Sequence, residues 1–286
     1  MLKITPFILA ACFVLSTATS CRKVYDYIRD HPDGHLDFCR VDTIRIKHND
    51  PLDDVLTVTY NKQGDPVTVL SHSIHGSGGQ YFRYDRLNRL TDYILTDIWD
   101  TGQAPFAILW HKYAYPRPGF VTDTSFSDFG DASKPAPNAA DDPIGYGIAG
   151  YTFDALGRID RYWSVSKNPL QPAIPGEKVI YDANGNLPLP ASSPGDTVLY
   201  YDNKVNPYRT NKVWQFVYRD YSRNNVLRHN LPYIPIYPPT VYNDFGLPLN
   251  LPNLNPLGNQ QFNLYNSDNV INITYACSMP KGPIDY

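Results

Sequence analysis

Residues 151–159 read Tyr-Thr-Phe-Asp-Ala-Leu-Gly-Arg-Ile, and this stretch predicts a β-hairpin. Aromatic side chains alternate at Tyr151 and Phe153, as they do along a half-buried strand. Asp154 opens the turn, where its carboxylate can accept hydrogen bonds from backbone N–H groups. Gly157 stands where a type I turn with a G1 bulge needs a residue at positive φ. The stretch therefore predicts two antiparallel strands joined by a tight turn.

The same seven-residue pattern recurs along the chain. It consists of an aromatic residue, Asp or Asn, two free positions, Gly or Asn, one free position, and an apolar residue or proline. Further complete copies begin at the following aromatic residues, given with later members of their turns: Tyr60 with Gly64, Tyr84 with Asp85 and Asn88, Tyr181 with Asp182 and Gly185, Tyr242 with Gly246, and Tyr265 with Asn269. A broken copy begins at Tyr201, with Val205 at the Gly position, and Tyr113 is interpreted as a vestigial copy. Repeated hairpins of this kind predict an antiparallel meander.

The composition indicates an all-β protein. Glu177 is the only glutamate among 28 acidic residues, and aspartate favours turns whereas glutamate favours helix interiors. The chain also has 23 tyrosines, 26 prolines and 18 glycines, residue types that suit strands and the turns between them. Because the copies are irregularly spaced, we expect β-hairpins that form one curved meander sheet or an open barrel, and not a regular shell.

One short helix is predicted within this β-rich chain, at residues 210–226. Thr210 or Asn211 can cap its N-terminus. One face of it would carry three residues at a spacing of four: Val213, Val217 and Tyr221.

The first 21 residues have the organisation of an export signal. Lys3 precedes an apolar run, Ile4–Leu15, and a short stretch of small polar residues leads to Cys21. The run has about a dozen residues, whereas a membrane-spanning helix needs about twenty. A cysteine directly after small residues resembles the lipobox of bacterial lipoproteins, although Ala18 stands where leucine is usual. That resemblance implies that Cys21 is acylated and attaches the protein to the lipid bilayer; the alternative is an ordinary secretory signal.

Two cysteines, Cys39 and Cys277, remain for the folded part of the chain. Exported proteins meet an oxidising compartment, so these two thiols are disulfide candidates. Cys39 precedes the first strand-like segment and Cys277 closes the last one, so a bridge would tie the ends of the domain together. The alternative is two unpaired, buried cysteines.

The hairpin at 151–159 resembles a YD repeat of the RHS type. The chain as a whole resembles short, uncharacterised lipoproteins of Gram-negative bacteria that carry a few loose YD-like hairpins, some of them classed as domains of unknown function. The resemblance implies a location in the cell envelope, at the outer membrane, with the periplasmic or surface face left open. It also implies four parts: a signal peptide at 1–20, a lipidated tether at 21–38, a YD-like β-hairpin domain at 39–277 and a tail at 278–286.

No catalytic signature accompanies these features. Removal of the signal removes Lys3, so 24 of the 25 basic residues remain with 28 acidic ones and the formal net charge is −4. This net negative charge gives no basic surface for binding nucleic acid. His72 and His75 lie three apart but have no HExxH or CxxC partner, so we expect neither a metal nor a cofactor. Ser164–Lys167 has SxxK spacing without the motifs that accompany it in penicillin-binding enzymes.

The leading hypothesis is a non-enzymatic β scaffold that binds a protein or glycan partner. The aromatic residues either stack on sugars or on a protein partner, or are buried in the sheet core. They include four tryptophans: Trp99, Trp110, Trp163 and Trp214. The alternative function is a polysaccharide hydrolase, with two aspartate catalysts that the sequence does not identify.

Overall fold

The computed structural model describes residues 36, 38–46, 54–71, 79–97, 106–127, 130–131, 133, 146–166, 174–189, 199–228, 239–252 and 270–278. Their strands are β1 (Cys39–Ile46), β2 (Asp54–Tyr60), β3 (Pro66–Ser71), β4 (Gln80–Tyr84), β5 (Leu90–Asp97), β6 (Phe106–Arg117), β7 (Phe120–Ser127), β8 (Tyr146–Phe153), β9 (Ile159–Ser166), β10 (Ile174–Lys178), β11 (Leu199–Tyr201), β12 (Val226–Arg228), β13 (Asn250–Pro252) and β14 (Val270–Cys277). The helical segments are a 3-10 turn, η1 (Pro207–Thr210), and one α-helix, α2 (Lys212–Tyr218).

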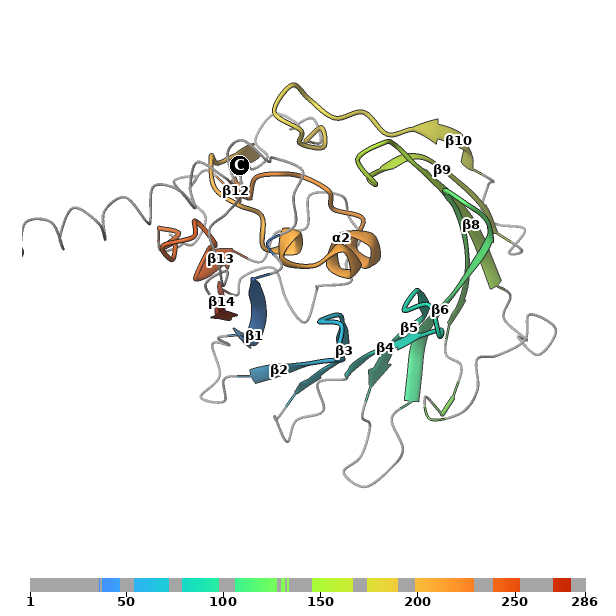
Figure 1. Ribbon diagram of the computed structural model, residues 1–286, viewed down its shortest axis with the longest axis horizontal. Helices are drawn as coiled ribbons and strands as arrows, with labels where there is room; N and C mark the ends of the chain where they lie inside the picture. Colours follow the sequence, from blue (N-terminus) through green and yellow to red (C-terminus); the bar gives the residue numbers. More distant parts are fainter. Residues whose placement is uncertain are drawn as a thin grey trace, which may run out of the picture.

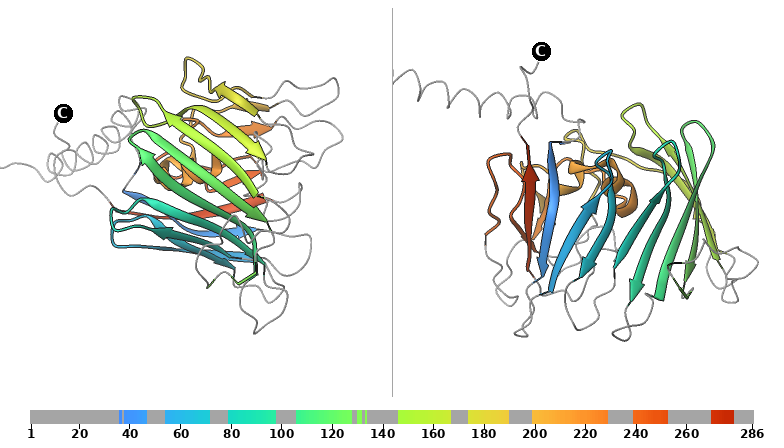
Figure 2. Two further views of the ribbon diagram at one scale, coloured as in Figure 1. Left: turned by 90° about the vertical axis from the view of Figure 1, so that its right-hand side faces the viewer. Right: turned by 60° about the horizontal axis from the view of Figure 1, so that its bottom comes forward.

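Twelve of these strands form one antiparallel sheet in the order β10-β9-β8-β7-β6-β5-β4-β3-β2-β1-β14-β13. From β1 to β10 every strand pairs with the next one along the chain, whereas β14 returns to lie between β1 and β13. The sheet curves around α2 and is not closed among the described strands, since β10 and β13 are its edges (Figure 1 and Figure 2). The predicted all-β fold with one curved meander sheet is therefore confirmed.

The motif turns between β2 and β3, β4 and β5, β6 and β7, and β8 and β9 share one end of the sheet, because successive strands alternate in direction. We call it the motif end. In the turn after Phe153, Asp154 Oδ1 accepts the N–H groups of Leu156 and Arg158, both at 2.9 Å. Gly157 has a φ of 76°. Positive φ also occurs at the corresponding position of four other copies: Gly64, Asn88, Gly185 and Gly246. The pattern thus produces the turn that it predicts.

The vestigial copy begins at Tyr115, and its assignment to Tyr113 is wrong. Gly119, four residues after Tyr115, has a φ of 70° in the turn between β6 and β7. Tyr113 is instead a buried strand residue. Pro116 occupies the position of the usual Asp or Asn, so the side chain that marks the turn in the other copies is missing here. The copy at 265–271 lies mostly outside the described residues.

Tyrosine hydroxyls join successive copies of the motif. In four cases Oη donates to the backbone carbonyl of the last motif residue in the preceding copy. The pairs are Tyr84 to Pro66 at 2.5 Å, Tyr115 to Leu90 at 2.8 Å, Tyr181 to Ile159 at 2.9 Å and Tyr201 to Leu187 at 2.8 Å. Burial is the first cause that raises the pKa of all four hydroxyls, so each remains a donor at neutral pH. Each of these four copies is therefore tied to the copy before it.

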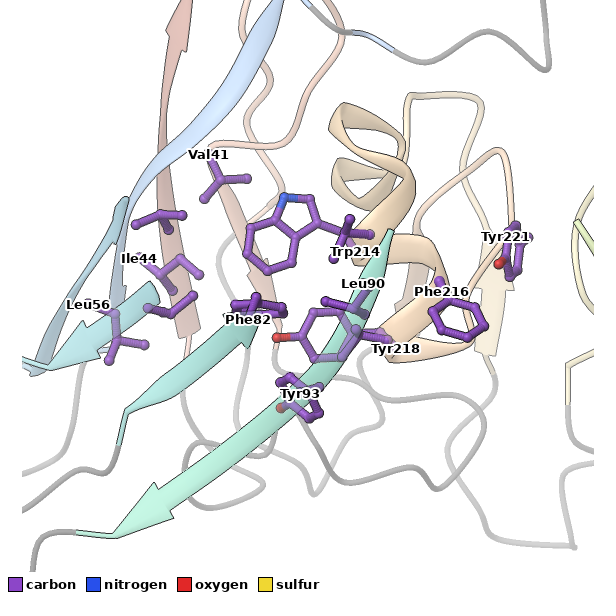
Figure 3. Close-up of a cluster of buried hydrophobic side chains, with 14 of the residues drawn as sticks. Val41, Ile44, Leu56, Phe82, Leu90, Tyr93, Trp214, Phe216, Tyr218 and Tyr221 are labelled. Atoms are coloured by element: carbon purple, nitrogen blue, oxygen red, sulfur yellow. The ribbon is translucent and has the colours of Figure 1, made fainter. Parts of the chain in front are cut away.

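The concave face of the sheet packs against α2. The ring of Trp214 meets that of Phe82 edge to face at 5.3 Å between centroids, and Phe216 lies 5.0 Å from Tyr113. Figure 3 shows these helix side chains among residues of the strands beneath them. Every residue of α2 after Lys212 is buried, so the helix fills the hollow that the curved sheet leaves.

The helix is shorter than the sequence predicts. Asn211 is its N-cap, as one of the two predicted caps, and its Oδ1 accepts the N–H of Val213 at 2.7 Å. The helix ends at Tyr218, because Arg219 turns the chain with a left-handed φ of 56°. The predicted extension to residue 226 is wrong. Tyr221 is buried, which explains its apolar spacing, but it lies beyond the helix.

A disulfide joins Cys39 to Cys277 across β1 and β14, at a sequence separation of 238. The predicted bridge between the two ends of the domain is therefore present. In the simple chain-entropy description, closing so long a loop stabilises the fold by about 5 kcal/mol. The bridge fixes the last described strand beside the first, a pairing that no turn enforces.

We predict that Phe153→Tyr stabilises the protein. Phe153 is the only first-position aromatic without a hydroxyl among the copies described, and the pairing of β8 with β7 would place a hydroxyl there near the backbone carbonyls at the start of β7. The new hydrogen bond should raise the free energy of unfolding by about 1 kcal/mol, measured by urea denaturation. Tyr84→Phe removes the equivalent bond to Pro66 and should lower it by about as much. A loss of stability in Phe153→Tyr would contradict the repeat geometry.

Candidate binding site

A cavity of about 740 Å³ lies at the motif end, between α2 and three turns. These are the turns between β4 and β5, β6 and β7, and β8 and β9. The opposite wall comes from α2 with Arg209 and Tyr221 on either side of it in the sequence. We call this cavity the turn pocket. Its volume lies within the range of small-molecule pockets, about 300 to 1,000 Å³.

The turn pocket has an aromatic and aliphatic lining. Tyr115, Phe120 and Phe153 come from the sheet side and are half-buried. Leu87 and Leu156 stand at its rim with 73% and 51% of their surfaces exposed. Both leucines occupy the fourth position of the motif, at the tip of a turn. Their exposed side chains add apolar surface at the rim of the turn pocket, because they do not pack into the core.

Basic side chains also line the turn pocket, and two of them are already paired. Arg89 lies 2.7 Å from the carboxylate of Asp85, and Arg158 lies 2.8 Å from that of Asp154. Both arginines occupy the sixth motif position, and each stacks over the tyrosine of the next copy. The distances from guanidinium carbon to ring centroid are 4.6 Å for Arg89 over Tyr115 and 4.1 Å for Arg158 over Tyr181.

Three further cations complete the basic lining: Arg117, Arg209 and Lys212. Arg209 is 4% exposed, whereas Arg117 and Lys212 are exposed. Arg117 stacks on Phe120 with 4.9 Å between the guanidinium carbon and the ring centroid. Neither Asp nor Glu is among the described residues that line the turn pocket.

A second cavity of about 490 Å³ shares Asn88 and Lys212 with the turn pocket. Side-chain amides bridge the turns around it. Asn88 Nδ2 donates to Asp65 Oδ2 at 2.5 Å, and Asn211 Nδ2 donates to Asp65 Oδ1 at 3.0 Å. The N-terminus of α2 is thereby tied to two motif turns, which holds the walls of both cavities in place.

The cluster of ionisable side chains that most resembles a catalytic group consists of His111, Asp123 and Arg219. His111 Nδ1 lies 2.9 Å from both carboxylate oxygens of Asp123, and Arg219 donates to Asp123 Oδ2 at 2.9 Å. Burial would raise the pKa of Asp123, but His111 and Arg219 together lower it below its ordinary value. The Arg219 guanidinium also lies over the Tyr151 ring, 4.2 Å from its centroid. None of these residues lines the turn pocket, and we assign the cluster to joining the C-terminus of α2 to β6 and β7.

The structure gathers part of the predicted site. Phe153 and Gly157 line the turn pocket, whereas the turns at Gly64, Gly185 and Gly246 lie outside its described lining. In the turn at Asp182, Asp182 Oδ1 accepts the backbone N–H groups of Asn184 and Asn186, as in the other motif turns. In the described part of the chain no group of three or more His, Cys, Asp or Glu residues could hold a metal.

Other predicted residues fall elsewhere. Trp110 and Trp214 are buried core residues, so neither is available to a partner. Cys21, Trp99, His72 and His75 lie outside the described residues, as does Lys167. Within the described ranges, no helix is long and apolar enough to span a membrane.

Two aromatic residues of the turn pocket were not predicted from the sequence. Tyr115 and Phe120 were not recognised as part of a motif copy because Pro116 replaces the usual Asp or Asn in their turn. The signal that remains is the spacing Tyr115 to Gly119 to Val121, which matches the first, fifth and seventh motif positions. The Arg at the sixth position of two copies was the second available signal.

No protein-family model matches this chain, and no curated protein matches it.

We predict that Asp123→Asn destabilises the protein by about 3 kcal/mol at pH 7, because it leaves Arg219 buried without its counter-charge. The pKa of Asp123 is lower in the folded than in the unfolded protein. Its contribution is therefore complete above the unfolded value of about 3.9 and is lost as pH falls further, through the folded pKa. The stability difference between wild type and variant, measured by urea denaturation, should narrow below about pH 4.

Asp244→Asn is the control for this experiment, because Asp244 is an exposed turn residue. It should change the free energy of unfolding by less than about 0.5 kcal/mol. A difference between wild type and Asp123→Asn that stays constant down to pH 3 would contradict the ion-pair role.

Proposed function

We propose that this chain is a lipid-anchored lipoprotein of the cell envelope that binds a glycan, without catalysis, in the turn pocket. The observation that carries the proposal is the pocket itself. It combines half-buried aromatic rings, Tyr115, Phe120 and Phe153, with exposed cations on β6 and α2. Aromatic faces stack on the C–H faces of sugar rings, and charged side chains orient the polar groups.

The concave shape favours a glycan over a protein partner. Most protein–protein interfaces are extended surfaces of about 800 Å² on each side, whereas small ligands are enclosed by pockets. Two of the three turns of the turn pocket are held by the hydrogen bonds of Asp85 and Asp154, and Asn211 caps α2 on the opposite wall. Walls held in this way lower the entropy lost on binding.

The anchor rests on the leader and on Cys21. The chain enters the fold at the motif end, because β1 begins there with Cys39 beside the turn that holds Gly64. Residues 22–35 separate Cys21 from Leu36, the first described residue. At about 3.5 Å for each residue, they reach no farther than about 50 Å. Acylation of Cys21 would thus hold the turn pocket close to the bilayer, where glycans of the envelope are found.

The repeat geometry supports the resemblance to YD-type lipoproteins. An aromatic residue, an Asx that accepts two backbone N–H groups and a residue at positive φ recur in successive hairpins. The polysaccharide hydrolase finds no comparable support, because it needs two carboxylates at a cleft and the described lining of the turn pocket contains none.

We predict that Phe120→Ala weakens glycan binding at least about tenfold, because it removes an aromatic face from the turn pocket. The full chain would be screened on a glycan array, and the affinity for retained glycans would then be measured by calorimetry. Tyr200→Ala is the matched control, since Tyr200 is 37% exposed on β11 and lies outside the described lining. A protein that retains no glycan but co-purifies with a membrane protein would contradict the proposal and select a protein partner.

We predict that Cys21→Ala abolishes acylation. In a Gram-negative host supplied with a labelled fatty acid, the wild-type chain should carry the label and sediment with membranes. The variant should lose both properties, because no other residue is expected to hold the chain to the bilayer. Cys39→Ser is the control, since it removes a cysteine of the disulfide and leaves the lipobox intact. Labelled Cys21→Ala protein would disprove the anchor.

A further inference from the structure

We infer that the ligand of the turn pocket is an acidic glycan, whose uronic acid carboxylate is bound between Arg117 and Lys212. The inference rests on the proposed function and names its substrate class. The two cations stand on different walls of the pocket: Arg117 is the last residue of β6, and Lys212 is the first residue of α2.

The charge balance of the turn pocket is the first observation. Arg89 and Arg158 are neutralised by Asp85 and Asp154 on their own turns. Arg117 and Lys212 are in no ion pair with a described residue, and no described lining residue is acidic. The whole chain is acidic, with a formal charge of −3. A local excess of positive charge is therefore not a consequence of composition, and it favours an anion.

The Arg117 side chain is preorganised to bind such an anion. Pro116 and Pro118 flank it and fix the backbone φ on both sides. Its guanidinium is stacked on the ring of Phe120. A guanidinium held flat by an aromatic ring still offers its N–H groups at the edge, where they match the two oxygens of a carboxylate. This contact restricts the side chain before any ligand arrives, which lowers the conformational entropy lost on binding.

The neighbouring surfaces fit the rest of a sugar. Phe120 and Tyr115 add aromatic surface on the same wall as Arg117, and one face of each ring is covered by an arginine. Lys212 faces them across the cavity as a compact charge with three donors, which can reach a carboxylate or an adjacent hydroxyl. One uronic acid residue in this pocket would therefore contact an aromatic ring, a planar cation and a compact charge.

The experiment compares acidic and neutral glycans that are otherwise alike. The full chain is tested on an array of oligogalacturonates, their methyl esters and phosphorylated mannose oligosaccharides. We expect the free uronates to bind at least about tenfold more tightly than the methyl esters, and this preference to shrink as salt rises. Arg117→Gln and Lys212→Gln should each remove most of the preference.

Two control variants keep the result interpretable. Arg161→Gln and Lys62→Gln remove exposed cations of the same two kinds outside the described lining, and both should leave the preference unchanged. Equal loss in all four variants would indicate a general charge effect and overturn the inference.

The remaining outcomes separate the inference from the proposed function. Binding of neutral glycans alone, weakened by Phe120→Ala, would overturn the acidic ligand and leave glycan binding standing. Binding of phosphorylated sugars alone would overturn the carboxylate. Retention of no glycan would overturn both.

Discussion

The sheet depends on the hydrogen-bonded turn that closes each copy of the motif. One side-chain oxygen accepts two backbone N–H groups, as Asp154 does, and a residue at positive φ completes the turn. Together they allow one turn geometry, which sets the strand residues that pair. In four copies a tyrosine hydroxyl then joins the turn to the one before it. Neighbouring hairpins are held at the motif end as well as along their strands.

A curved sheet rich in aromatic residues needs a cover for its concave face, and α2 provides it. Both ends of this short helix are fastened to the sheet. At its N-terminus Asn211 donates to Asp65, and just past its C-terminus Arg219 donates to Asp123. Seven residues make too few hydrogen bonds to be stable as an isolated helix. The helix therefore owes its existence to these contacts and to the burial of Trp214 and Phe216.

The turn pocket follows from the same arrangement. The pocket lies between α2 and the motif turns at one end of the sheet. On the side of the turns, its lining residues occupy set positions of the motif. The fourth position supplies leucines, and the sixth supplies arginines in two copies. Positions that the turn geometry leaves free can carry binding residues without cost to the fold. The degenerate turn at Pro116 contributes most to the proposed site, since it holds Arg117 and Phe120 against the pocket.

Local sequence was enough to predict the hairpins, the all-β class, the N-cap and the pair of cysteines, because each depends on residues a few positions apart or on the number of available partners. It did not predict that α2 ends at Tyr218, because Arg219 leaves the helix to reach Asp123, a contact 96 residues away in sequence. It also missed the turn pocket. Its walls come from three hairpins and a helix, and their residues meet only when the curved sheet wraps around α2. Short-range hydrogen bonding can be read along the chain, whereas packing between distant segments arises only in the folded structure.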